Sequence, residues 1–154
     1  MLTALIDYCQ SLVCRCAKHS HSHFYQYVLG RKMPIRLLYI EDSVDTIQMV
    51  KLALESEDFE VIPARSGLEG IQKILQEKPD IILLDIMMPG FNGYDVLKAL
   101  KQKPNPLPTP IIILSAKTAQ EDIDRAMAYG ATDYITKPFD ILLLADRLRD
   151  RLNQ

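Results

Sequence analysis

The stretch "PDIILLDIMMPGFNG" (79–93) places a carboxylate at the end of a short apolar run. Ile81–Leu84 predict a strand buried on both faces, and Asp85 follows it directly. Burying an unpaired charge is costly, so an acid in this position usually has a partner or a chemical role. Three other predicted strands also end on polar side chains: Glu41 and Asp42 after the first, Ser115 after the fourth and Lys137 after the fifth.

These side chains would form one site if the strands are parallel, because the carboxyl ends of parallel strands meet at one edge. Clustered carboxylates repel one another unless a cation lies among them, and an all-oxygen site suits Mg²⁺ before Ca²⁺. A lysine ammonium and a serine hydroxyl both suit phosphoryl oxygens. Asp85 is the expected nucleophile, because an aspartate with an ordinary pKa of about 3.9 is already ionised near neutrality. The chemistry predicted is formation of an aspartyl phosphate within an oxyanion clamp.

The apolar pattern predicts a frame that would bring these residues together. From Met33 onward, apolar runs alternate with amphipathic patterns five times, which predicts a parallel sheet covered by helices on both faces. The fold class expected is α/β, a doubly wound five-stranded parallel sheet of order 2-1-3-4-5 with a flavodoxin-like (βα)5 arrangement. Strands are expected at 35–40, 59–64, 80–85, 110–116 and 132–137, and helices at 45–56, 66–77, 92–103, 118–130 and 139–152.

Residue spacing inside the expected helices predicts their ends and buried sides. Ser66 with Glu69, and Thr118 with Glu121, have the spacing of a capping box. Asn92 is an expected N-cap, and Gly130 an expected C-cap. The apolar sides predicted are Ile47, Val50, Leu52 and Leu54 in the first helix, Ile71, Ile74 and Leu75 in the second, Val96, Leu97 and Leu100 in the third, and Ile141, Leu144, Leu148 and Leu152 in the last, with Leu142 and Leu143 outside this stripe.

Composition sets the broad class of protein. A chain of 154 residues with 48% apolar and 25% charged residues suggests one globular domain. The net charge of −2 gives no indication of nucleic-acid or membrane binding. No apolar run approaches the roughly 18 residues of a membrane span. The first residues lack a basic lead and a cleavage site, so we expect a cytoplasmic protein.

Residues 1–32 are expected to be an N-terminal extension, flexible or forming a short helix, with the main domain at 33–154. This extension carries all the cysteines and histidines of the chain, which offers a metal-binding alternative to the interpretation as an arm with reduced thiols. Their spacing matches no common zinc-ligand pattern, so the arm is the preferred interpretation. The residues concerned are Cys9, Cys14, Cys16, His19, His21 and His23.

Four motifs together resemble the response-regulator receiver domains of two-component signalling, including the chemotaxis-type single-domain regulators. They are "YIEDS", "LLDIMMPGFNG", "ILSA" and "DYITKPF", and the resemblance covers about residues 34–153. It implies Asp85 as the phosphoacceptor, Ser115 and Lys137 as partners of the phosphoryl group, and a cis bond before Pro138. It also implies a Mg²⁺ site formed by Asp42, Asp85 and the backbone carbonyl of Met87, with Glu41 near the ion through a water. Many relatives have Asp where this chain has Glu41.

The resemblance further implies a switch and a set of partners. Ser115 would move toward the phosphoryl group and Tyr134 would turn inward behind it, whereas the alternative for Tyr134 is a half-buried strand aromatic. No nucleotide-binding loop is recognisable, so the phosphoryl donor would be a phosphohistidine on a sensor histidine kinase or a phosphotransfer protein. Output would be contact with a downstream protein target, with no nucleic acid bound and no membrane insertion. The domain would assist only its own phosphorylation and dephosphorylation, and so would not be an enzyme.

Three alternatives remain open from the sequence. An aspartate-nucleophile phosphatase shares acids at strand ends, but such enzymes typically carry Asp-x-Asp where this chain has Asp85-Ile86-Met87. A phosphorylation-independent interaction module would not need the complete set of acids, hydroxyl and lysine. A receiver that forms a homodimer through the face of its fifth strand is the third alternative.

Overall fold

The computed structural model of the chain describes residues 33–102 and 108–153. Within those residues, five strands alternate with five helices, as the apolar pattern predicts. The N-terminal extension at 1–32, with its cysteines and histidines, lies outside the described residues. In chain order the elements are β1 (Ile35–Ile40), α3 (Val44–Glu55), β2 (Phe59–Ala64), α4 (Gly67–Glu77), β3 (Ile81–Leu84), α5 (Gly93–Lys101), β4 (Ile111–Ser115), α6 (Gln120–Ala128), β5 (Asp133–Thr136) and α7 (Ile141–Leu152).

The strands form one parallel sheet of order β2-β1-β3-β4-β5, which confirms the predicted topology. Strand β1 pairs with β2 on one side and with β3 on the other, so the chain reverses its winding direction there. The register places Ile40 opposite Leu84 and Ser115 opposite Thr136. The last residues of β1, β3, β4 and β5 therefore lie along one edge of the sheet.

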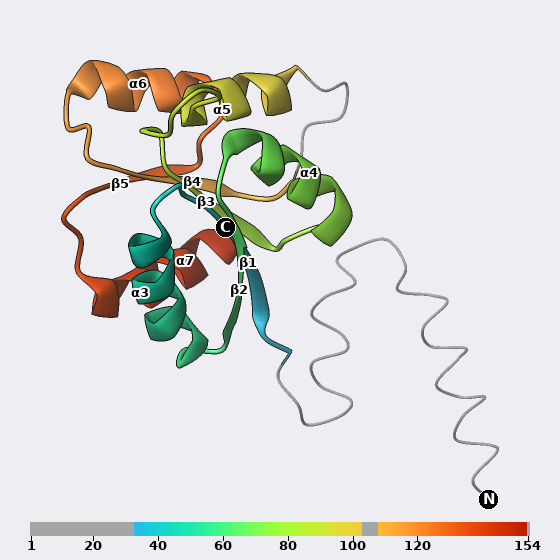
Figure 1. Cartoon of the computed structure of the whole chain (residues 1–154). Coiled ribbons are helices and arrows are strands. Elements are labelled where there is room, and N and C mark those ends of the chain that lie inside the picture. The colour runs from blue at the N-terminus through green and yellow to red at the C-terminus, as the bar shows by residue number, and fades with distance from the viewer. Residues whose placement is uncertain (1–32, 103–107, 154) are drawn as a thin grey trace, which may run out of the picture. The chain divides into compact units, whose positions relative to one another are not determined.

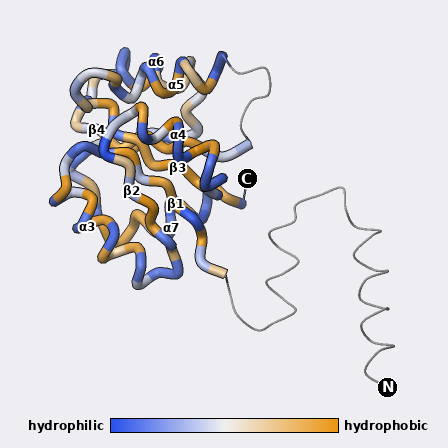
Figure 2. The backbone as a smooth tube through the Cα atoms, turned by 45° about the vertical axis from the view of Figure 1, so that its right-hand side comes forward, coloured by the Kyte–Doolittle hydropathy of each residue, from blue (hydrophilic) through white to orange (hydrophobic). Residues whose placement is uncertain are grey.

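Alternate side chains of the strands divide the core into two layers. Leu38, Ile82 and Ile113 pack under α4, α5 and α6 on one face of the sheet. Leu37 and Leu83 pack under α3 and α7 on the other. Figure 1 shows these two helix groups on opposite sides of the sheet, and Figure 2 shows the hydrophobic colouring along the central strands. Burial on both faces explains why the strands are nearly continuous apolar runs.

Two predicted buried side chains are in fact exposed. Leu52 is 73% exposed, because Ile47, Val50 and Leu54 form the buried side of α3 and position 52 faces away from it. Leu75 is 56% exposed, because Gly67, Gly70 and Ile74 form the buried side of α4 instead. A Cβ at Gly70 would lie 2.5 Å from the Ile40 side chain, so only glycine permits this close contact.

The predicted helix ends are confirmed at three places and wrong at one. Ser66 caps α4 by accepting from the Glu69 amide, but the Glu69 carboxylate accepts from the Arg65 amide, so this predicted capping box is only half formed. Asn92 caps α5 in a capping box closed by Asp95. Gly130, with a φ of 100°, follows the end of α6. Thr118 does not cap α6, which begins after Ala119 without any side-chain cap. The one-residue shift removes the spacing that the capping box with Glu121 needs.

The last helix has the apolar stripe that its sequence predicts. Leu144 and Leu148 are buried in the sheet-facing core, and Ile141 and Leu152 are packed partly against it. Leu142 and Leu143 point away and are 81% and 63% exposed. Within the described residues, no helix has the length and apolar content that crossing a bilayer requires.

Candidate functional site

The residues after the strands are held at one edge by the sheet itself. The Asp85 amide donates to the Ile40 carbonyl at 2.9 Å, and the Lys137 amide donates to the Ser115 carbonyl at 2.8 Å. These backbone hydrogen bonds continue the parallel ladder one residue past the strand ends. Asp85 is thereby fixed at the carboxyl ends of β1 and β3, where the winding direction reverses, which is the ligand-binding position of open α/β sheets. Lys137 is fixed beside β4 at the same edge.

Lys137 joins two buried carboxylates. Its Nζ lies 2.6 Å from Asp85 Oδ2 and 2.7 Å from Glu41 Oε2. Glu41 and Asp85 are only 2% and 4% exposed, whereas the Lys137 side chain is 22% exposed. We call these three residues the acceptor cluster. Burial alone would lower the pKa of Lys137, but its hydrogen bonds with Asp85 and Glu41 outweigh burial and raise it.

Every oxygen of the Glu41 carboxylate has a protein partner. Oε2 accepts hydrogen bonds from Lys137 and from the Tyr39 hydroxyl at 3.0 Å, and Oε1 accepts from the Ser43 amide at 3.2 Å. Burial is the main reason that the pKa of Glu41 is raised, and the charge of Asp85 adds to it. Lys137 and the Ser43 amide oppose the shift. The acceptor cluster therefore carries more negative charge than its lysine neutralises.

Asp85 is turned toward the loop that follows β3. Its Oδ1 accepts a hydrogen bond from the Met87 amide at 2.8 Å, while Oδ2 faces Lys137. A Cβ at Gly93 would lie 2.4 Å from the Asp85 carbonyl oxygen, so α5 begins in close contact with this strand end. Asp42 is half-buried beside Glu41, and Met87 is 55% exposed. Both remain accessible at the same edge.

Ser115 and Tyr134 are linked through the backbone of Lys117. The fully buried Ser115 accepts a hydrogen bond from the Lys117 amide at 3.4 Å, and the Tyr134 hydroxyl donates to the Lys117 carbonyl at 2.9 Å. Burial raises the pKa of Tyr134, and a hydrogen bond with Ser115 opposes that shift. Tyr134 is 9% exposed and thus lies inward in this structure. The predicted movement of Ser115 and Tyr134 stays a prediction.

The donor set suits a hard cation. Glu41, Asp42 and Asp85 offer only oxygen atoms, and one lysine does not balance three carboxylates. Within residues 33–102 and 108–153, no three side chains of His, Cys, Asp or Glu are grouped closely enough to hold a metal by themselves. An ion here would therefore rely on fewer carboxylates, a backbone carbonyl and water, which is the habit of Mg²⁺.

The sequence predicts most of this edge but misses two of its contacts. The bond before Pro138 is cis, as expected. The contact between Lys137 and Glu41, and the hydroxyl of Tyr39 on the same carboxylate, were not predicted. The sequence offers one signal for the second contact: Glu41 directly follows β1 and lies two residues after Tyr39, and alternate residues along an extended chain share a face.

Comparison with known proteins identifies the family. The model of the response regulator receiver domain matches residues 37–149. Response regulator ArlR from Staphylococcus saprophyticus subsp. saprophyticus is 38% identical over 119 residues, which cover 77% of this chain and 53% of that protein. The chain spans about half the length of the curated relatives it matches.

Similarity to solved structures points to the same family. Chemotaxis protein CheY4 of Vibrio cholerae has a TM-score of 0.70 and 31% identity, covering 76% of this chain and 98% of that one. The BeF3-activated N-terminal receiver domain of Klebsiella pneumoniae RstA has a TM-score of 0.69 and 30% identity, covering 77% and 99%. The chain therefore belongs to the response regulator receiver domain family of two-component signalling.

Proposed function

We propose that Asp85 accepts a phosphoryl group from a phosphohistidine on a partner sensor kinase or phosphotransfer protein. The observation that carries this proposal is the buried Asp85 carboxylate, held at the switch point of the sheet with Lys137 Nζ 2.6 Å away. In the transfer, the bond between phosphorus and the histidine nitrogen breaks while a bond to an Asp85 oxygen forms. An ionised carboxylate can attack phosphorus without a general base.

Lys137 and Ser115 would hold the transferred group. The Lys137 ammonium can exchange part of its contact with Asp85 for a phosphoryl oxygen, which keeps its charge paired. The Ser115 hydroxyl, whose oxygen accepts from the Lys117 amide, can donate its proton to a second oxygen. The backbone hydrogen bond between Lys137 and Ser115 keeps the two residues side by side at the strand ends, where both can reach the transferred group.

Asp42, Asp85 and the carbonyl of Met87 would hold Mg²⁺, with Glu41 near it through a water. When bound, the ion would neutralise charge on the carboxylates and on the incoming phosphoryl oxygens. The half-exposed position of Asp42 leaves its oxygens accessible from solvent. Glu41, by contrast, is already committed to three protein donors. This supports an indirect role for Glu41 in the metal site.

Phosphorylation would switch a protein-binding face of the domain at 33–154. The proposed face joins Tyr134 on β5 to the exposed Leu142 and Leu143 on α7. A downstream protein is the proposed target, and pairing of two copies through the same face is a second outcome. Switching as a signalling module, rather than turnover as an enzyme, is part of the proposal. A cytoplasmic location also stays a prediction.

The test is phosphoryl uptake from a small phosphodonor such as acetyl phosphate, read by intact mass. The full chain should gain one phosphoryl group with Mg²⁺ and lose that gain when the ion is chelated. Asp85→Asn should abolish uptake, and Asp42→Ala should weaken Mg²⁺ binding strongly. Asp133→Asn is the matched control, because Asp133 is also a buried carboxylate but lies at the opposite end of β5. Uptake by Asp85→Asn equal to that of the unchanged chain would refute the assignment.

A further inference from the structure

Tyr39 is a polar residue in an apolar layer. It lies on β1 with no exposed surface, and its neighbours toward α3 and α7 include Leu37, Leu83 and Leu114. A buried tyrosine hydroxyl needs a hydrogen-bond partner, and that of Tyr39 is Glu41 Oε2 at 3.0 Å. Nothing in the packing of this layer calls for a hydroxyl, since the residues opposite Tyr39 on the adjacent strands, Pro63 of β2 and Leu83 of β3, are both apolar.

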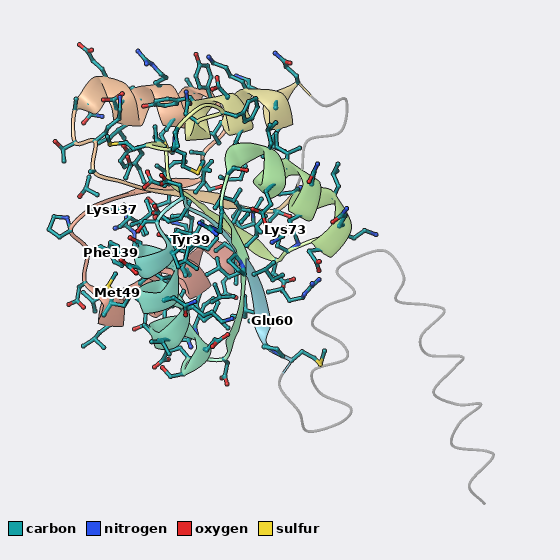
Figure 3. All side chains as sticks on the ribbon, viewed as in Figure 1. Tyr39, Met49, Glu60, Lys73, Lys137 and Phe139 are labelled. Carbon is teal, nitrogen blue, oxygen red and sulfur yellow. The ribbon has the colours of Figure 1, made fainter. Side chains whose placement is uncertain are left out.

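The hydroxyl acts on the acceptor cluster through one carboxylate oxygen. Oε2 of Glu41 accepts from Tyr39 and from Lys137, and the same Lys137 ammonium contacts Asp85 Oδ2. A continuous chain of hydrogen bonds thus runs from Tyr39 through Glu41 and Lys137 to Asp85. Figure 3 labels the Tyr39 and Lys137 side chains near the two ends of this chain.

The hydroxyl is a dependable donor. Burial raises the pKa of Tyr39 above its ordinary value, and the charge of Glu41 acts in the same direction. The proton therefore stays on the tyrosine, and the lone pairs of Glu41 are the acceptors. Phenylalanine would keep the ring in the core and remove only this donor.

We propose that Tyr39 is a positioning residue of the phosphoacceptor site: it holds the Glu41 carboxylate in the orientation that places Lys137 against Asp85. This inference rests on the proposed role of Asp85. It also gives a role to the extra methylene of Glu41, because an aspartate at this position would be too short to contact the Tyr39 hydroxyl and the Lys137 ammonium in the same way. Glu41 spans the gap between the hydroxyl on β1 and the ammonium after β5, instead of turning toward a metal.

The first measurement needs neither metal nor phosphodonor. In chelator at constant pH, the ¹⁵Nζ resonance of the Lys137 ammonium should be sharp in the unchanged chain, because both of its carboxylate partners are fixed. Tyr39→Phe should broaden or shift that resonance. In a Glu41→Gln background, Tyr39→Phe should add no further change, since the route from Tyr39 to Lys137 passes through this carboxylate.

The second measurement is the rate of phosphoryl uptake at saturating Mg²⁺. Tyr39→Phe should lower the rate constant roughly three- to tenfold, the scale expected for losing one net hydrogen bond of about 1 kcal/mol, since Tyr39 acts on Asp85 only through Glu41 and Lys137. The half-saturating phosphodonor concentration should stay unchanged. Tyr94→Phe is the matched control: its hydroxyl also donates to a carboxylate, Asp122 Oδ1 at 2.8 Å, but Asp122 lies on α6 and outside the acceptor cluster.

Two results would overturn the proposal. One is a Lys137 resonance in Tyr39→Phe identical to that of the unchanged chain. The other is a rate no lower than that of Tyr94→Phe. If Asp85 itself proved not to accept the phosphoryl group, the metal-free resonance would still decide whether Tyr39 positions Lys137. Failure of the positioning role is therefore distinguishable from failure of the proposed function.

Discussion

Two charged clusters lie at the two ends of β5, one with an excess of acidic side chains and the other with an excess of basic side chains. At its carboxyl end, the acceptor cluster sets two buried carboxylates, Glu41 and Asp85, against one lysine. At its amino end, one buried carboxylate meets two arginines: Asp133 accepts from Arg147 on both oxygens and from Arg151, each at 3.0 Å. We call this second group the arginine cluster; it consists of Asp133, Arg147 and Arg151.

The difference in charge balance shifts the pKa values of the buried acids in the two clusters in opposite directions. Burial works against ionisation of Asp133, but hydrogen bonds from Arg147, the Tyr134 amide and Arg151 outweigh it, so its pKa is lowered. The pKa of Glu41 is raised, because burial and Asp85 outweigh the single lysine. The arginine cluster is thus electrostatically satisfied and serves stability. The acceptor cluster retains excess negative charge, which a divalent cation would neutralise.

The largest effect is expected from Lys137→Ala. Removing the only ammonium of the acceptor cluster leaves two buried carboxylates facing each other, so the free energy of unfolding should fall by about 3 kcal/mol. The melting temperature in chelator should then drop by roughly 10 °C while the far-ultraviolet spectrum keeps its shape. Added Mg²⁺ should recover more of this loss than it adds to the unchanged chain, since the carboxylates lack another cation.

Arg147→Ala is the control for Lys137→Ala. It removes one cation from the arginine cluster but leaves Arg151 in contact with Asp133. Its loss of stability should be smaller and should not respond to Mg²⁺. An equal gain from Mg²⁺ in Lys137→Ala and in the unchanged chain would contradict the difference drawn between the two clusters. Phosphorylated Lys137→Ala should also lose the spectroscopic response that accompanies the switch.

A smaller effect is expected from Asp133→Asn. At neutral pH it should lower the free energy of unfolding by about 1–2 kcal/mol, because Arg147 is half-exposed and solvent screens part of the interaction. The lowered pKa of Asp133 fixes the sign of the pH dependence. Its contribution is complete above the ordinary pKa of about 3.9 and disappears as pH falls through the lowered value.

Urea unfolding of Asp133→Asn and the unchanged chain at a series of pH values tests this. The difference in stability should be largest near neutrality and should shrink as pH falls below the ordinary aspartate pKa of about 3.9. Phosphoryl uptake should be unaffected. A difference that persists undiminished in acid would show that the carboxylate charge is not what stabilises the arginine cluster.

The smallest effect is expected from Asp122→Asn. Asp122 is paired with Lys117 at 3.0 Å and accepts from the Tyr94 hydroxyl, but the Lys117 side chain is 37% exposed. Solvent screens such a pair, so the fall in melting temperature should be less than that of Asp133→Asn and should diminish further with added salt. A fall in melting temperature larger than that of Asp133→Asn would mean that burial does not determine how much each carboxylate contributes to stability.

The sheet and the residues at its carboxyl edge can be predicted from the sequence, because they follow from the order of apolar runs and polar ends and do not depend on side-chain conformation. Strands β1 and β2 begin and end where predicted, since apolar runs with clear polar ends define them. The parallel topology then brings Asp85, Ser115 and Lys137 to one edge without any knowledge of rotamers. The expected strands at 80–85, 110–116 and 132–137 each lose a residue at either end.

The missed features depend on side-chain geometry. Whether Lys137 reaches Glu41 as well as Asp85 depends on the reach and direction of three long side chains. The prediction places Leu75 wrongly because two glycines, Gly67 and Gly70, form the buried side of α4 together with Ile74. A pattern of apolar residues gives no signal for a buried helix side that is formed partly by glycines.

The measurement that tests the central claim most directly is chemical mapping of the phosphorylated residue. After incubation of the full chain with acetyl phosphate and Mg²⁺, borohydride reduction converts an aspartyl phosphate to homoserine, which peptide mass spectrometry locates. We predict the modification at Asp85, the proposed nucleophile of the acceptor cluster, and its loss when the ion is chelated. Modification at Asp42 or Glu41, with Asp85 intact, would contradict it.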